Sequence, residues 1–190
     1  MPRHPIIHNH TGDEPISLAE AKQYLRIDSS FTDDDIYIFN LIQIARVTVL
    51  KDTNQVVVKE SIEQHFDSWG DGILQLSFPG VLTDFEISYR NEIGSNVVMT
   101  ADTDYVLGVS SPIDGRIEML NTPALATKIN GIRVLYKSEP DNESVIKPLL
   151  IAIYMLIQHW YDHRSPVKHL QTYVTPIGYQ KIVNNYKQFI

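Results

Sequence analysis

Two histidines, His159 and His163, stand four residues apart near the end of an apolar stretch. On a helix this spacing places both imidazole rings on one face, as in pairs of zinc ligands. A metal site also needs a third ligand and groups that orient the ligands, and the sequence marks neither. Positive charge near a helix C-terminus is favoured by the helix dipole, which is the simpler interpretation. A metal-dependent hydrolase that uses this pair with a carboxylate is an alternative hypothesis.

Other polar groups have structural explanations. His8, Asn9 and His10 are contiguous in a proline-rich segment, whereas the nuclease motif that shares their letters joins residues far apart in sequence. Asp33–Asp35 lack the alternate spacing and the glycine of a calcium loop, and they suit the first turn of a helix. No phosphate loop, nucleophile elbow or Ser/His/Asp signature is present. The sequence therefore predicts a protein that is not an enzyme and has no metal or other cofactor.

The composition limits the class of protein. The chain has 190 residues, of which 43% are hydrophobic, enough for one domain or for a domain with a large insertion. Its formal net charge is −7, and its 16 basic residues are scattered. Sequence-specific binding of nucleic acid is not expected, because phosphate contacts use clustered Lys and Arg. An acidic surface can still line a passage for DNA, since like charge prevents adhesion.

The chain contains no cysteine, which excludes disulfides, thiolate catalysis and cysteine-based zinc sites. Residues 1–15 lack the apolar stretch of a secretory signal, so we expect synthesis in the cytoplasm.

The two histidines are positioned by a predicted helix over Pro148–Arg164 whose first part is strongly apolar. From Pro148 to Ile157 the only polar side-chain group is the Tyr154 hydroxyl. A membrane span needs roughly 20 such residues, so this run is too short to cross a bilayer. A surface helix would show a polar face, and this run has none. We expect protein to enclose the helix, from its own domain, from neighbouring subunits or from both, with Pro148 in the first turn.

Three further helices are predicted. Ser17 and Glu20 form a capping-box pattern that starts a short helix ending near Arg26. A second helix is expected from Thr32 to about 51–54, with an apolar stripe of Ile38, Leu41, Ile42, Ala45 and Val49. Beyond Pro176 and Gly178, the tail Tyr179–Ile190 fits a short amphipathic helix with apolar positions Ile182, Tyr186, Phe189 and Ile190.

The middle of the chain alternates with period two and predicts an antiparallel β module. The expected strands are Gln55–Lys59, Ile62–Phe66, Ile73–Phe78, Asp84–Arg90, Asn96–Met99, Asp104–Leu107, Arg116–Leu120 and Ile132–Lys137. The fold class is therefore α+β, with N- and C-terminal helices forming a small bundle and an antiparallel β module inserted between them in the sequence. The expected segments are a mobile arm (1–15), helical parts (16–54 and 138–175), the β module (55–137) and a C-terminal tail (176–190).

The order of these elements resembles the head–tail connector (adaptor) proteins of tailed phages, in particular longer members with an inserted β region. The resemblance covers roughly residues 15–190. It rests on Ile16–Ile27, Asp34–Arg46, Ile73–Pro79, Phe85–Tyr89, Asp104–Leu107, Gly115–Ile117 and the closing His159–Arg164, where an aromatic pair precedes an arginine.

This resemblance implies a structural protein of a phage or prophage, made and assembled in the bacterial cytoplasm and located in the virion. It implies self-association into a ring below the portal protein, around the path of DNA, with tail or head-closure proteins as further partners and no membrane. We expect Ile182, Tyr186, Phe189 and Ile190 to contact the portal. A tail-completion or head-closure protein is the alternative within virion assembly.

Overall fold

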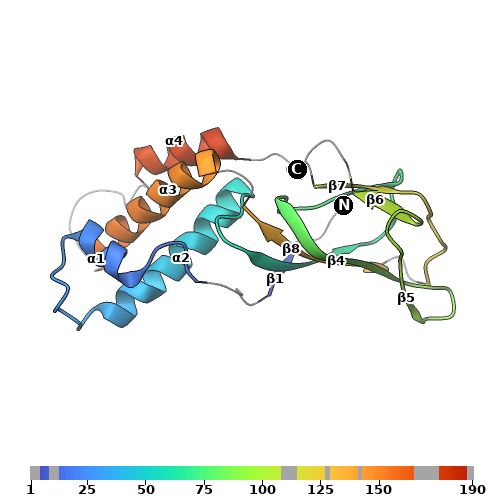
Figure 1. Cartoon of the computed structure of the whole chain (residues 1–190), viewed down its shortest axis with the longest axis horizontal. Coiled ribbons are helices and arrows are strands. Elements are labelled where there is room, and N and C mark those ends of the chain that lie inside the picture. Colours follow the sequence, from blue (N-terminus) through green and yellow to red (C-terminus); the bar gives the residue numbers. More distant parts are fainter. Residues whose placement is uncertain are drawn as a thin grey trace. The chain divides into compact units, whose positions relative to one another are not determined.

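The computed structural model describes residues 5–8, 13–107, 115–126, 129–140, 143–164 and 176–187. The chain forms two compact units, each built from separate stretches of sequence. We call them the helical unit (13–58 and 142–189) and the β unit (1–12, 59–141 and 190). Among the described residues, the helical unit contains the helices α1 to α4, and the β unit contains eight strands in two antiparallel sheets (Figure 1). The predicted α+β class, with helices at both ends of the chain and an inserted antiparallel module, is confirmed.

Helix α1 (Leu18–Leu25) begins where the capping box predicts. The Glu20 N–H donates to Ser17 Oγ at 3.2 Å, and the Ser17 N–H donates to Glu20 Oε2 at 2.8 Å. These bonds satisfy donors that a helix N-terminus otherwise leaves without partners. The helix ends at Arg26, which has a left-handed backbone with φ of 58°.

Helix α2 (Asp35–Thr53) begins three residues later than predicted. Asp34 occupies the N-cap position but makes no capping hydrogen bond with its side chain. Its carboxylate is used in a contact with α3, described below. The acidic triplet therefore does more than fill a first turn.

Helix α3 (Glu143–Asp162) begins earlier than predicted, so Pro148 lies inside the helix and not in its first turn. Proline there removes one helical hydrogen bond, which the packing of the following turns must offset. Helix α4 (Ile177–Tyr186) follows Pro176 directly, so it includes Gly178 and begins before the predicted start at Tyr179.

The core of the helical unit lies mainly between α2 and α3, which pack side by side (Figure 1). Most of its fully buried residues come from the predicted stripe of α2 and from the apolar run of α3: Ile38, Ile42, Ala45, Val49, Leu149, Ala152, Ile153 and Ile157. The chain's own helices therefore enclose most of the apolar run.

The β unit contains a five-stranded sheet in the order β1 (Ile6–Ile7), β2 (Glu60–Phe66), β8 (Ile132–Glu139), β4 (Val81–Arg90) and β5 (Asn96–Val98). A second sheet has the order β3 (Ile73–Gln75), β7 (Arg116–Met119) and β6 (Tyr105–Leu107). Buried Gln64 links β2 to residues near β3, since its Nε2 donates to Gln75 O and its Oε1 accepts from the Ser77 N–H.

Two sequence predictions for this region are wrong. Gln55–Lys59 forms no strand: Val56 and Val57 are buried in the connection that leaves α2, which also explains their apolar character. The N-terminal arm, for which no strand was predicted, contains β1, which pairs with β2. The His8 N–H extends this pairing by donating to Ser61 O at 2.9 Å.

Candidate functional site

The predicted histidine pair lies at the C-terminal end of α3. The two rings are 4.7 Å apart between centroids, and His163 Nδ1 is 2.7 Å from the carbonyl oxygen of His159. A carbonyl only accepts, so the His163 ring donates to it and caps the helix end. Burial, and next the neighbouring His163, lower the pKa of His159. The hydrogen bond from His163 therefore helps to stabilise this helix end, and the lowered pKa of His159 disfavours positive charge there.

The pair also lines a hollow of about 320 Å³ together with Thr48, Asp52 and Tyr179. Tyr179 Oη donates to Asp52 Oδ2 at 2.6 Å, which ties α4 to the end of α2. Within the described residues, no group of three or more His, Asp or Glu side chains is placed to hold a metal ion. In the part of the chain that the structure describes, the two imidazoles therefore lie together without the third ligand that the hydrolase hypothesis requires.

Asp34 and Arg164 form a junction between the start of α2 and the end of α3. The guanidinium donates to both carboxylate oxygens, at 3.0 and 2.7 Å, and lies 3.8 Å from the Tyr161 ring centroid. Tyr161 Oη also donates to Asp34 Oδ2 at 2.6 Å. These hydrogen bonds, chiefly those from Arg164, hold the pKa of Asp34 below its ordinary value. The closing motif of the connector resemblance therefore has a structural role in this chain.

Lys22 fixes the turn between α1 and α2. Its Nζ donates to Phe31 O at 2.6 Å, to Ser29 O at 3.2 Å and to Asp35 Oδ1 at 2.8 Å. The side chain is nearly buried, and this set of partners satisfies its charge. Two of the three predicted aspartates thus bind cationic side chains of this chain.

The four tail residues expected to contact a portal divide into two groups. Ile182 and Tyr186 lie on α4 and are half-buried against the core of the helical unit. Phe189 and Ile190 lie outside the described residues. The structure therefore gives the first two a part in packing α4 and leaves part of each side chain exposed.

Sequence reasoning missed a set of exposed apolar side chains on the helical unit. On α2 the exposed fractions are 80% at Ile36, 54% at Ile44 and 44% at Phe39, and on α3 the fraction is 49% at Ile151. The signal was present in the sequence, because α2 carries apolar residues outside its core stripe.

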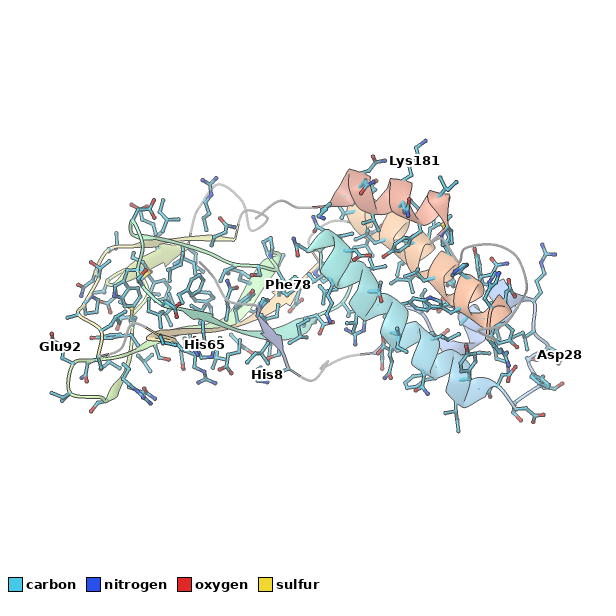
Figure 2. The ribbon with its side chains drawn as sticks, turned by 180° about the vertical axis from the view of Figure 1, so that it is seen from behind. His8, Asp28, His65, Phe78, Glu92 and Lys181 are labelled. Atoms are coloured by element: carbon cyan, nitrogen blue, oxygen red, sulfur yellow. The ribbon has the colours of Figure 1, made fainter. Side chains whose placement is uncertain are left out.

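The β unit contains a second cluster of titratable residues, centred on Glu63 of β2. Its carboxylate accepts from Arg133 Nη2 at 3.0 Å and lies 2.9 Å from His8 Nε2 and 2.8 Å from His65 Nε2. Figure 2 labels both histidines on this unit. The hydrogen bond from Arg133 contributes most to lowering the pKa of Glu63 from 4.5 to about 2.

This cluster makes the β unit sensitive to acid. A carboxyl group with a lowered pKa in the folded state stabilises the fold above pH 4.5, and this contribution is lost as the pH falls toward 2. We expect Glu63→Gln to lower the free energy of unfolding by about 1–3 kcal/mol at pH 7, with the difference shrinking toward pH 2. Urea unfolding at several pH values measures this.

The matched control is Glu118→Gln, an exposed carboxylate on β7. It should change stability by less than about 0.5 kcal/mol at each pH. If the free energy of unfolding depended on pH equally in the natural chain and in Glu63→Gln, Glu63 would not be the source of the acid sensitivity.

Among the described residues, no helix is both long enough and apolar enough to cross a membrane. No model of a known protein family matches the chain, and no curated protein matches it in sequence.

The fold nevertheless has close counterparts among solved structures. A chain of the "neck of empty GTA particle computed with C6 symmetry", where GTA is a gene transfer agent, matches with a TM-score of 0.73 and 16% identity, over 99% of this chain and 97% of that one. A chain of the "virion of native gene transfer agent (GTA) particle" gives 0.69 and 16%, over 99% and 97%. A chain of the "neck of native GTA particle computed with C12 symmetry" gives 0.68 and 13%, over 97% and 96%. These three matches show that the chain has the same fold as those chains.

Proposed function

We propose that this protein is a structural component of the neck of a phage-like particle, namely a head–tail connector that forms a ring below the portal. The observation that carries the proposal is the match in fold to chains of gene transfer agent necks, over nearly the full length of both chains. Both units of this chain are included in that match. The symmetry of those necks, C6 and C12, supports cyclic self-association.

The charge of the chain agrees with this role. A net charge of −7 disfavours tight binding to phosphate groups, so DNA could pass through such a ring without adhering to it. On this proposal the protein is made in the bacterial cytoplasm and becomes part of the virion. It acts by assembly and not by catalysis.

Electron microscopy of the purified protein mixed with the portal protein of the same phage or prophage tests the proposal. The expected result is an added ring at the outer end of the portal. A portal that gains no density contradicts the connector role. A ring that forms on a tail component instead would identify the protein as a tail-completion or head-closure protein.

We propose that the portal contact involves the C-terminal tail, through Ile182, Tyr186, Phe189 and Ile190. Deleting all of 179–190 would be a poor test, because Tyr179 and Val183 are only 3% and 7% exposed in the helical core. A Phe189→Ser/Ile190→Ser double variant spares those residues. We expect it to melt like the natural protein and to bind the portal at least about tenfold more weakly.

Surface plasmon resonance on immobilised portal measures the change. The matched control is Lys181→Ser, since Lys181 is exposed on α4 and projects from it in Figure 2. Unchanged affinity of the double variant would exclude a role for these two residues in portal binding.

A further inference from the structure

The outward side of α2 carries no charge over about three turns, from Ile36 to Val47. We define the α2 face as Ile36, Phe39, Asn40, Gln43, Ile44 and Val47. The one charged side chain within this span, Arg46, is buried and donates to Glu14 Oε2 at 2.9 Å, so it does not belong to the face. A solvent-facing helix surface normally carries charged residues, whereas the centres of protein interfaces are depleted of them.

A second exposed apolar surface lies on α3 and α1. We define the α3 face as Ile151 and Tyr24, which are 49% and 39% exposed. The Tyr24 ring stacks on Tyr154 of α3 with centroids 4.7 Å apart, which holds it beside that helix. The face is therefore formed by side chains that packing keeps in place.

The two faces point in opposite directions. The core stripe of α2, with Ile42 at its centre, packs on the core side of α3 around Ile153. On a helix, residues outside the core stripe point away from it. The α2 face thus lies on one side of the α2–α3 layer and the α3 face on the other, and Figure 1 shows these two helices side by side.

Closed rings use pairs of surfaces of this kind. In a ring of many copies each subunit contacts its two neighbours through two different surfaces, which lie on nearly opposite sides of it. We propose that the α2 face of one copy packs against the α3 face of the next copy, with Phe39 and Ile44 as central anchors. The occupant is a second copy of this chain because the fold's counterparts form cyclic necks and because one unit carries both faces. This inference rests on the proposed function and names the contact that builds the ring.

Cross-linking tests the contact directly, since the natural chain has no cysteine. A Phe39→Cys/Ile151→Cys double variant is treated with a short bismaleimide, alone at high concentration and with the portal. We expect a ladder of covalent oligomers on a denaturing gel, ending at the subunit number of the ring. An equal mixture of the two single variants should stop at dimers, and each single variant alone should stay monomeric.

Each result has a distinct meaning. A ring seen by electron microscopy without a ladder overturns this contact and leaves the proposed function standing. If cross-linking of the protein alone gives a ladder, the contact is supported even when electron microscopy shows no ring added to the portal. Dimers from Phe39→Cys alone would mean that two α2 faces meet symmetrically, which overturns the head-to-tail arrangement. The absence of both ring and ladder overturns the contact together with the proposed function.

A charge variant gives a second test. Phe39→Glu/Ile44→Glu places two like charges at exposed positions, so the monomer should keep its melting temperature within a few degrees. We expect its self-association to weaken at least about a hundredfold, because the contact would have to bury both charges. The matched control is Ile93→Glu, which adds a charge at a position that is 86% exposed between β4 and β5, and which should assemble normally. Normal assembly of the double variant would refute the proposal.

Discussion

An Ile153→Ala variant is expected to lose about 3–4 kcal/mol of unfolding free energy. Ile153 is 0% exposed at the centre of α3, where it packs on the core stripe of α2. Truncation removes buried methyl groups and leaves a cavity that tightly packed neighbours fill only in part. Urea unfolding followed by the fluorescence of Trp160 measures the loss. A Trp69→Phe background, used for both proteins, removes the signal of the β unit's tryptophan.

Ile151→Ala, two residues away on the same helix, is the matched control. Its side chain is 49% exposed, so the isolated monomer should lose less than about 1 kcal/mol. Similar losses for the two variants would contradict the assignment of Ile153 to the core and Ile151 to an outer face. Because Ile151 belongs to the proposed contact between copies, Ile151→Ala should instead weaken assembly of the ring.

The features that the sequence predicted well depend on local interactions. The capping box of Ser17 and Glu20 fixes the start of α1 through bonds between residues three apart. The stripe of α2 and the apolar run of α3 define a core because helical periodicity determines which side chains share a face. The general fold followed from these patterns and from the alternation in the middle of the chain.

The features that the sequence did not predict depend on contacts between distant residues. Asp34 reads as a helix cap, yet its partner Arg164 lies 130 residues away. Val56 and Val57 belong to a run of three valines, a residue type typical of strands, but here both are buried in a connection that forms no strand. β1 has two residues, too few to show any period. The predicted stripe of α2 left Ile36, Phe39 and Ile44 unassigned, and only the structure shows that these apolar residues are exposed.

Gly80→Ala is expected to lower the free energy of unfolding of the β unit by about 3 kcal/mol. Gly80 precedes β4, at the point where Val81 pairs with Glu139 of β8. A Cβ atom on Gly80 would collide with the carbonyl oxygen of Glu139 and would lie 2.5 Å from Ser138 Oγ. The carbonyl oxygen is held in place because it belongs to a paired backbone, and Ser138 is fully buried. Relief of the collision therefore requires the start of β4 to move away from β8.

The effect is measured by urea unfolding with Trp69 fluorescence in a Trp160→Phe background, together with hydrogen exchange of the β4 and β8 amides. Gly178→Ala is the matched control, because its Cβ would meet only the flexible end of Met155, at 3.3 Å from Cε. Inside α4 an alanine should leave stability unchanged or raise it by up to about 1 kcal/mol, since glycine is the poorer helix former. If Gly80→Ala were as stable as Gly178→Ala, β4 and β8 could not be packed as closely at this point as the structure has them. A loss confined to Gly80→Ala, with faster exchange in the first residues of β4, would attribute the effect to this close approach and not to the added methyl group.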